Sequence, residues 1–452
     1  MHKQTLPPST QSSTSSVRFS PAPIDAPAKV KNVIVVGLGY VGLPLALIAR
    51  SKGHHVAGID LDSKKRAQIK KGVVPDLDEL SSRELASRPL SVTQEFDAVK
   101  NADIVIICVP TPVTHDYTPN LEPLKKACAS VAQHIRPGQL IVSESTVHPG
   151  TAEEILIPLI EKISGLKAGR DFGFAHCPER INPGDTAWPI EKIPRVVGAT
   201  TLHALKESAA FYRSILDADV HEMSTIREAE AVKMVENSFR DINIAFVNEL
   251  AMSFDKLGID VTHVLTGAST KPFGFMLHSP GCGVGGHCIP VDPYYLIRYA
   301  KQNGFTHRFL SLAREINNHM PAFTVQMLED ELNKKELSLS GSTIALLGLS
   351  YKANVSDLRE SPAFEIEHLL KEKGAVVRTF DPTSLERSSV KTLREALDRA
   401  DAAVIATGHD LFKSLTPSSF LAHDVRIVID GRNCLNNERF AKIAGAYRGI
   451  GR

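Results

Sequence analysis

The fold follows from one stretch near the start of the chain, Val33-Ile34-Val35-Val36-Gly37-Leu38-Gly39-Tyr40-Val41-Gly42. Its first four residues are all β-branched, which is typical of a buried parallel strand. The glycines come immediately afterwards and open a helical pattern over residues 43–51. Residues 55–59 supply a second strand-like run. The stretch therefore predicts a strand–helix–strand unit with glycines at its first turn.

The glycine spacing at this turn suits a pyrophosphate group. The first glycine permits a tight turn, the second lets the backbone approach the ligand, and the third allows helix–strand packing, while the helix N-terminus stabilises negative charge. Asp60 ends the second strand, 18 residues beyond Gly42, where an acid accepts from a ribose 2′-hydroxyl and repels a 2′-phosphate. The pattern predicts a site for NAD rather than NADP; a turn without ligand is the alternative. The residues expected there are Gly37, Gly39, Tyr40, Val41, Gly42 and Asp60.

Strand and helix patterns continue along the chain. Strands are expected over residues 104–109, 140–142 and 172–175. A helix without Pro or Gly is expected over residues 226–256, with more helical sequence over 310–337. Strand-like runs return over residues 344–347, 376–380, 403–406 and 427–429. The predicted fold class is α/β, with two Rossmann-like doubly wound parallel-sheet domains joined by a central α-helical module.

Composition narrows the functional classes. The 52 Lys and Arg residues nearly balance 51 Asp and Glu, and a net charge of +1 creates no general field for nucleic acid or an anionic membrane. No apolar run approaches the roughly 18 residues that span a bilayer. The 6 cysteines lack paired metal-type spacing, which argues against a disulfide framework or a metal site. We expect a cytoplasmic protein that binds neither nucleic acid nor membrane and holds no metal.

The most distinctive motif is a glycine-rich segment, Pro280-Gly281-Cys282-Gly283-Val284-Gly285-Gly286-His287-Cys288-Ile289-Pro290-Val291-Asp292. Four glycines within six positions give a backbone that can wrap closely around a ligand. Cys288 at the end of this run is a candidate nucleophile, and Asp292 is placed to orient a partner or transfer a proton. Cys282 is expected to fill space inside the run; a disulfide or shared reactivity with Cys288 is the alternative.

Side chains on the long helix form a second candidate group. Lys233 and Asn237 stand four residues apart and share a helix face, with Arg240 further along. An ammonium group beside an amide can stabilise a developing oxyanion. A solvated helix face is the alternative interpretation.

Three loops carry weaker signals. Residues 143–147 and 177–180 follow strands, where dinucleotide folds bind ligands; capped turns are the alternative. Residues 351–362 follow a strand of the last domain and contain Lys352 and Arg359, which suit phosphate contacts. A surface salt-bridge loop is the alternative there.

Taken together, these stretches resemble the UDP-glucose/GDP-mannose dehydrogenase family over residues 33–431. The resemblance rests on the Gly37 fingerprint, Val109-Pro110-Thr111-Pro112, Glu144-Ser145-Thr146 with Pro149-Gly150-Thr151, Pro178-Glu179-Arg180, Lys233 with Asn237, Gly285-Gly286-His287-Cys288, and Asp357-Leu358-Arg359-Glu360-Ser361-Pro362. It implies an NAD-binding domain over residues 29–222, a central helical dimerisation and catalytic module over 223–335, and a C-terminal nucleotide-sugar-binding domain over 336–452. Residues 1–28 are rich in Ser, Thr, Pro and Ala, and this composition predicts a disordered tail.

The resemblance also implies roles for individual residues. Cys288 would attack an aldehyde intermediate, Lys233 and Asn237 would stabilise oxyanions, and Asp292 would assist proton transfer. Thr146 and Glu179 would position and activate water. Along NAD the family places Thr111, Thr146 and Arg359. The residues expected at the substrate are Glu179, Arg180, Lys233, Asn237, Arg240, Lys271 (from a neighbouring subunit of a homodimer or higher oligomer), Gly281, Gly283, Gly285, Lys352 and Arg432.

The nucleophile loop also indicates the substrate. UDP-glucose and GDP-mannose enzymes commonly read Gly-Gly-Ser-Cys-hydrophobic-Pro-Lys-Asp, whereas His287 and Val291 make this loop similar to the N-acetylhexosamine branch. Residues 270–275 resemble UDP-N-acetylglucosamine 6-dehydrogenases, and residues 236–241 are closer to UDP-N-acetylmannosamine dehydrogenases. We favour four-electron oxidation of UDP-N-acetylglucosamine at C6 through a cysteine thiohemiacetal and thioester. UDP-N-acetylmannosamine and UDP-glucose are the alternatives.

Two other functions compete with this one, the first a binding function and the second enzymatic. A non-catalytic NAD sensor would keep the Gly37 turn but needs no combination of Cys288, Lys233 and Asn237. A two-electron 3-hydroxyacid dehydrogenase needs neither a nucleophilic cysteine nor a second α/β domain. The number of NADH molecules formed per substrate separates the three functions. A sensor forms none, a 3-hydroxyacid dehydrogenase forms one, and a four-electron nucleotide-sugar dehydrogenase forms two.

Overall fold

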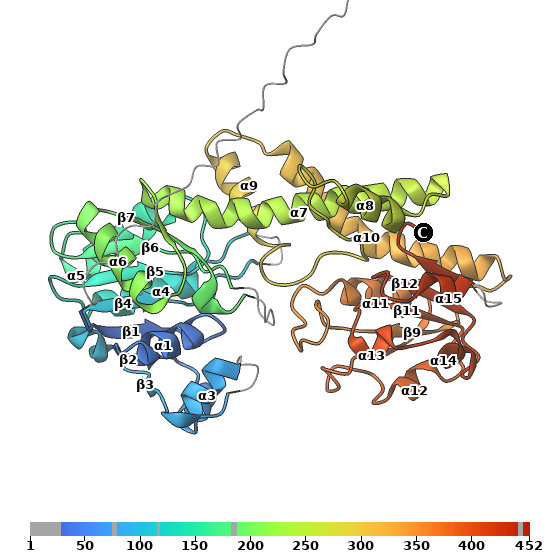
Figure 1. The fold of residues 1–452 in the computed structure, drawn as a ribbon, viewed down its shortest axis with the longest axis horizontal. Coiled ribbons are helices and arrows are strands. Elements are labelled where there is room, and N and C mark those ends of the chain that lie inside the picture. Colours follow the sequence, from blue (N-terminus) through green and yellow to red (C-terminus); the bar gives the residue numbers. More distant parts are fainter. Residues whose placement is uncertain (1–28, 75–78, 115–117, 182–187, 442–445) are drawn as a thin grey trace, which may run out of the picture.

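The computed structural model describes residues 29–74, 79–114, 118–181, 188–441 and 446–452. The tail predicted over residues 1–28 lies outside them. Figure 1 shows two α/β units with a long helix from the middle of the chain, residues 226–257, running across both. This arrangement confirms the predicted class of two Rossmann-like domains and a helical module. Among the described residues, no helix combines the length and the apolar character needed to cross a membrane.

The first sheet has its strands in the order β3-β2-β1-β4-β5-β6-β7-β8. β1 lies between β2 and β4, parallel to both, so the crossovers change direction there. Open sheets bind ligands outside the carboxyl ends of strands at such a point. The strands are β1 (Asn32–Val36), β2 (His55–Ile59), β3 (Ser91–Thr93), β4 (Ile104–Ile107), β5 (Leu140–Ser143), β6 (Gly173–His176), β7 (Arg195–Ala199) and β8 (Val220–Glu222). The helices are α1 (Gly42–Ser51), α2 (Ser63–Lys70), α3 (Glu79–Ser87), η1 (Phe96–Asn101), α4 (Glu122–Ala132), η2 (Ala152–Leu156), α5 (Ile157–Ser164), η3 (Ile190–Lys192) and α6 (Leu202–Ile215).

The far edge of this sheet differs from the sequence prediction. β7 runs antiparallel to β6, an exception within the otherwise parallel sheet that the sequence patterns did not predict. Sequence patterns also did not predict β3, β7 and β8. β3 and β8 have three residues each, too few to show a period, and β7 begins with the charged residue Arg195.

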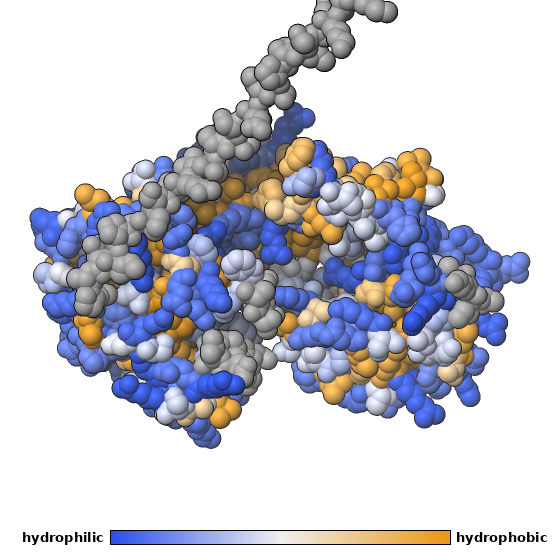
Figure 2. All heavy atoms as spheres, in the orientation of Figure 1, coloured by the Kyte–Doolittle hydropathy of each residue, from blue (hydrophilic) through white to orange (hydrophobic). Residues whose placement is uncertain are grey.

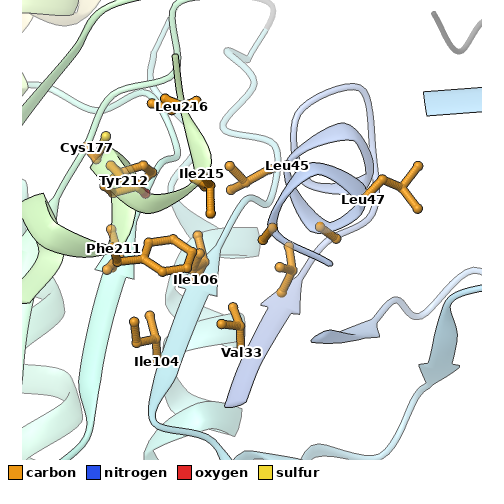
Figure 3. Packing of buried hydrophobic residues seen from close by; sticks show 14 of the residues in the cluster. Val33, Leu45, Leu47, Ile104, Ile106, Cys177, Phe211, Tyr212, Ile215 and Leu216 are labelled. Atoms are coloured by element: carbon orange, nitrogen blue, oxygen red, sulfur yellow. The ribbon is translucent and has the colours of Figure 1, made fainter. Parts of the chain in front are cut away.

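Alternate residues of the central strands pack on opposite faces of the first sheet. Val33 belongs to a cluster with α1 and α6, whereas its neighbour Ile34 packs with α4 and α5. Figure 3 shows Leu45 of α1 and Ile215 of α6 pointing toward one another beside the strands. Burial of each such side chain contributes about 1.5–3 kcal/mol. The two covered faces hold the carboxyl ends of the strands in place.

The helix α7 (Ile226–Leu257) connects the two domains. It begins at a capping box formed by Thr225 and Glu228 and ends at Gly258, whose φ of 67° suits glycine. Its 32 residues correspond to about 48 Å. Met234 packs in the core of the first domain, and Ala251 packs in the core of the second. The other helices of the module are α8 (Val261–Ser269), α9 (Asp292–Gln302) and α10 (Arg308–Asn333).

The second sheet is parallel throughout, in the order β10-β9-β11-β12-β13. Its strands are β9 (Thr343–Leu347), β10 (Val376–Phe380), β11 (Ala402–Ile405), β12 (Ile427–Asp430) and β13 (Ala446–Gly449). Its helices are α11 (Pro362–Glu372), α12 (Leu393–Leu397), α13 (Asp410–Lys413), α14 (Pro417–Leu421) and α15 (Asn437–Ala441). The four strands predicted from apolar runs are present, and β13 is an addition.

Candidate active site

The glycine turn after β1 has the backbone that a dinucleotide requires. A Cβ atom on Gly42 would lie 2.0 Å from the Gly37 carbonyl oxygen, so side chains cannot be accommodated at that packing contact. A Cβ on Gly39 would meet no protein atom within 4 Å, which leaves that side of the turn open to a ligand. Asp60 accepts from the Leu38 N–H at 2.9 Å and so holds the turn itself. These residues fit the pyrophosphate and ribose of NAD.

Two neighbouring loops complete the edge of this sheet. Thr111 follows β4, and its hydroxyl donates to the Thr146 carbonyl oxygen at 2.7 Å. The Ser145 hydroxyl donates to the Val109 carbonyl oxygen, also at 2.7 Å. The loops after β4 and β5 are therefore bound to each other beside the glycine turn.

Four of the predicted catalytic residues converge where α7 meets the start of α9. The Asn237 amide donates to the Asp292 carboxylate at 2.5 Å, and the Lys233 ammonium donates to the Glu179 carbonyl oxygen at 2.6 Å. Lys233, Asn237 and Asp292 are all buried, so the solvated-face alternative for this part of α7 was wrong.

Cys288 joins this group through its backbone. Its carbonyl oxygen accepts from the Asp292 N–H at 2.8 Å, which ties the thiol-bearing residue to the first turn of α9. The side chain is half-buried. All six cysteines are free, and Cys282 is fully buried with its thiol donating to the Ala406 carbonyl oxygen at 3.4 Å. The alternative of a disulfide between Cys282 and Cys288 is therefore not observed.

Burial controls the protonation of these groups. It raises the pKa of Asp292 to about 6, against the opposing effects of Lys233 and Asn237. Burial and the Asp292 charge raise the pKa of Cys288 to about 12. For Lys233, burial alone would lower the pKa, but negative groups led by Glu179 outweigh it and raise the pKa. At neutral pH the site thus combines a protonated thiol, a charged ammonium group and an ionised aspartate.

The glycine loop passes against the C-terminal domain. The Arg432 guanidinium donates to the Gly283 carbonyl oxygen at 3.1 Å, and the Gly286 N–H donates to the Arg359 carbonyl oxygen at 3.0 Å. A Cβ atom on Gly285 would lie 2.7 Å from the Cβ of Tyr351. The glycine at position 285 is therefore required for close approach of the loop to the second sheet.

Arg359 also reaches across to the first domain. Its guanidinium lies over the Tyr40 ring, 5.6 Å from the ring centroid, and its Nε donates to Asp357 at 2.9 Å. Tyr40 is half exposed, at 52%. The predicted cofactor residues of the first and last domains thus meet face to face.

Other predicted substrate residues lie at the margin of this cluster. Arg180 pairs with Glu236 of α7 at 2.5 Å and donates to the Pro194 carbonyl oxygen. Arg240 is exposed on α7, and Lys352 is half-buried in its loop. Lys271 lies in an exposed segment after α8, with its ammonium 4.8 Å from the centroid of the Phe273 ring.

The structure adds contacts that the sequence patterns did not predict. His287 Nδ1 lies 2.7 Å from the Cys288 sulfur, and the fully buried Tyr295 donates to the Thr111 carbonyl oxygen at 2.6 Å. Behind the loops, Tyr212 donates to the buried Glu144 at 2.5 Å, and Arg195 lies 3.8 Å from the same carboxylate. The adjacency of His287 to the thiol was a signal in the sequence; the contacts of the other residues depend on tertiary packing.

A dinucleotide turn, a thiol and a buried ammonium–carboxylate cluster at the junction of three modules define an oxidoreductase that uses NAD. Comparison with known proteins then identifies the family. Residues 31–216 match the NAD binding domain of the UDP-glucose/GDP-mannose dehydrogenase family, residues 227–319 its central domain, and residues 345–437 its UDP binding domain. The chain belongs to this family and is an NAD-dependent UDP-sugar dehydrogenase.

Several curated relatives match over most of their length. The chain is 38% identical to Protein CapL of Staphylococcus aureus, with 90% of this chain and 97% of the relative covered. It is 37% identical to the UDP-N-acetyl-D-mannosamine dehydrogenase of Pyrococcus horikoshii (93% and 99% covered). It is 36% identical to the UDP-N-acetyl-D-glucosamine 6-dehydrogenase of Pseudomonas aeruginosa (85% and 92% covered). The solved Pyrococcus horikoshii structure superposes with a TM-score of 0.87, covering 93% of this chain and 99% of the other.

The raised pKa of Asp292 leads to a prediction about pH dependence. If the ionised carboxylate exchanges protons with the reacting groups, kcat/KM rises with pH as Asp292 ionises near pH 6. Asp292→Asn should lower kcat/KM by about 10²–10⁴-fold and should abolish the fall in kcat/KM on the acid side of the pH–rate profile, called here the acid limb. The measurement is a pH–rate profile of NADH formation with this variant and the unsubstituted enzyme.

Glu230 supplies the control, because burial raises its pKa to about 7 while it accepts from two backbone N–H groups away from Cys288. Glu230→Gln should keep the limb near pH 6. If the fall in kcat/KM below pH 6 persists in Asp292→Asn but disappears in Glu230→Gln, the ionisation belongs to Glu230 and the assignment to Asp292 is wrong.

Proposed function

We propose that this UDP-sugar dehydrogenase oxidises a UDP-N-acetylhexosamine at C6 to the uronic acid in two successive two-electron steps. The observation that carries the proposal is the placement of Cys288 beside the Lys233, Asn237 and Asp292 cluster. In the balanced reaction, R–CH2OH, two NAD+ and one water give R–COO−, two NADH and three protons. A thiol near the oxidised carbon permits the second oxidation at that same carbon.

The first oxidation converts the C6 alcohol to an aldehyde. NAD held at the glycine turn supplies the hydride acceptor for both oxidations. Asp292, ionised at neutral pH, takes part in removing the hydroxyl proton, and the Lys233 ammonium stabilises the alkoxide that develops. Asn237 orients Asp292 through their 2.5 Å hydrogen bond.

The second oxidation passes through Cys288. Its sulfur adds to the aldehyde carbon while the thiol proton leaves, which gives a thiohemiacetal; His287 Nδ1, 2.7 Å from the sulfur, is the nearest hydrogen-bonding group on the loop. Lys233 and Asn237 stabilise the oxyanion. Loss of hydride yields a thioester, and water positioned by Thr146 and Glu179 breaks the carbon–sulfur bond to release the acid and the thiol.

The remaining predicted residues are assigned to binding. Thr111, Thr146 and Arg359 lie along NAD, because the two threonines stand on loops beside the glycine turn and Arg359 lies over the Tyr40 ring of that turn. Lys352 and Arg432 of the second domain bind the nucleotide portion of the substrate, where cationic side chains suit the diphosphate. Arg180, Arg240, Lys271 and the glycines at 281, 283 and 285 complete the sugar site, and Lys271 enters from a second subunit.

We favour UDP-N-acetylglucosamine as the sugar nucleotide because residues 270–275 are similar to the same segment of enzymes with that specificity. The relative from Pseudomonas aeruginosa, a UDP-N-acetyl-D-glucosamine 6-dehydrogenase by name, supports the same choice. The second candidate is UDP-N-acetylmannosamine, favoured by residues 236–241 and by the Pyrococcus horikoshii relative. The two sugars differ only in configuration at C2, so the enzyme's preference between them depends on its contacts with the acetamido group.

An assay against UDP-N-acetylglucosamine, UDP-N-acetylmannosamine, UDP-glucose and GDP-mannose tests the substrate class. The acetamido group offers both apolar area and hydrogen bonds, so an N-acetylhexosamine should exceed UDP-glucose in kcat/KM by about tenfold or more, equivalent to about 1.4 kcal/mol. NADH formation at saturating NAD is the readout. A preference for UDP-glucose or GDP-mannose would overturn the assignment.

Substitution of the two loop cysteines tests the covalent step. Cys288→Ser should retain the fold but lower uronic acid formation by at least about 10³-fold, because a hydroxyl is a poorer nucleophile and leaving group near neutral pH. Cys282→Ser is the matched control, since that thiol is buried against Ala406, and its turnover should stay within about twofold of the parent. Acid formation at the parental rate by Cys288→Ser would require a different nucleophile.

Exposed apolar side chains on α7 support a homodimer through the helical module. Val235, Phe239 and Phe246 are 60%, 47% and 52% exposed and recur at helical spacing. Figure 2 shows hydrophobic residues gathered along the edge where the central helices lie. Contiguous apolar surface of this kind is typical of a subunit interface.

Phe246→Arg should therefore convert the oligomer to a single chain, because a guanidinium group is costly to bury in an apolar interface. Light scattering coupled to size-exclusion chromatography measures the mass. Leu202→Arg, at a 70% exposed position on α6, should leave the mass unchanged. A parent protein that already elutes as one chain would contradict the dimer.

A further inference from the structure

Tyr295 lies on α9, three residues after Asp292, and its side chain is turned into the first domain. The residue is fully buried and packs with Val291 in the core cluster that includes strand residues of the first sheet. Its hydroxyl donates to the Thr111 carbonyl oxygen at 2.6 Å. Burial raises the pKa of Tyr295, so the hydroxyl remains a donor throughout the physiological range.

A second hydrogen bond extends this contact along the edge of the sheet. The Thr111 hydroxyl donates to the Thr146 carbonyl oxygen at 2.7 Å. Thr111 and Thr146 follow adjacent parallel strands, β4 and β5, whose carboxyl ends lie next to the glycine turn. Two bonds in series thus run from α9 to the loops after β4 and β5, beside the glycine turn.

The same N-terminal end of α9 also holds the thiol-bearing residue. The N–H groups of Val291 and Asp292 donate to the Cys288 carbonyl oxygen at 3.0 and 2.8 Å. Three residues of helix correspond to a rise of about 4.5 Å, so Tyr295 is one turn from the residues that hold Cys288. A single rigid turn therefore links the nucleophile to Thr111.

We propose that Tyr295 is a positioning residue that holds Cys288 at a fixed distance from the loops after β4 and β5, which border the NAD site, between the two oxidations. The inference rests on the proposed covalent function. Both oxidations act on the same carbon, so the sulfur and the hydride acceptor must keep a fixed relation while the aldehyde is present. A displacement of about 1 Å between reacting groups costs on the order of 100-fold in rate. When the link is lost, the aldehyde escapes before Cys288 captures it.

Tyr295→Phe and Tyr299→Phe form a matched pair of variants. Tyr295→Phe keeps the buried ring and removes only the hydroxyl, which donates to the Thr111 carbonyl oxygen at 2.6 Å and to the Pro112 carbonyl oxygen at 3.5 Å. Tyr299 lies one turn further along α9, where its hydroxyl donates to Glu154 at 2.8 Å and its ring stacks on His148 with centroids 4.4 Å apart. Tyr299→Phe keeps that stacking and removes a hydroxyl that does not reach Thr111. The pair separates the link from the general loss of a tyrosine hydroxyl.

Tyr295→Phe should lower the yield from two NADH per sugar toward one, with free aldehyde recovered by trapping with hydroxylamine, and should reduce kcat at least tenfold. Tyr299→Phe should keep two NADH per sugar and release no aldehyde. Without substrate or cofactor, amide hydrogen exchange should rise in Tyr295→Phe over residues 108–114 and 288–296, and not in the second sheet.

The proposal is overturned if Tyr295→Phe yields two NADH per sugar with kcat within twofold of the parent, or if Tyr299→Phe releases as much aldehyde. Exchange that rises equally in all parts of Tyr295→Phe would also overturn it, since that marks a purely structural role. Failure of the proposed function is distinct: the parent enzyme itself would then form fewer than two NADH per UDP-sugar, whatever the variants do.

Discussion

The hydrogen bond from the Asn237 amide to the Asp292 carboxylate joins the helix that connects the two domains to the helix that follows the thiol. Both residues are buried, and the second is an ionisable group that water no longer solvates. Removing the partner of a buried charged group costs about 1.5–3 kcal/mol or more, because the desolvated carboxylate is left unsatisfied. This bond therefore sets the position of α9, and with it Cys288, Asp292 and Tyr295, relative to α7.

The same burial gives the cluster its chemistry. It raises the pKa values of Asp292 and Cys288, while Lys233 stays charged because negative groups surround it. The carboxyl group of an aspartate in water has a pKa of about 3.9, so the raised pKa of Asp292 brings this group closer to the neutral range in which it can exchange protons. The cost of removing them from water is offset by the packing of α7, whose two ends lie in two different hydrophobic cores.

The C-terminal domain completes the site through backbone contacts. The glycine loop approaches the second sheet so closely that a side chain at Gly285 would overlap Tyr351, and Arg432 holds the loop at Gly283. From the same domain, Arg359 extends over the Tyr40 ring of the glycine turn. The nucleophile is thus placed by contributions from the first sheet, the helical module and the second sheet together.

The sequence by itself determined the fold class, the dinucleotide turn, the long helix and the nucleophile loop, because each depends on local periodicity or on glycine conformation over a few residues. Lys233 and Asn237 were predictable as neighbours, since four residues separate them on one helix. Only the tertiary structure decided that this face is buried, that Asn237 meets Asp292, and that Tyr295 reaches Thr111, because these contacts join residues 55 and 184 positions apart. Strands of three residues and the antiparallel β7 were likewise beyond local patterns, since their pairing depends on strands already in place.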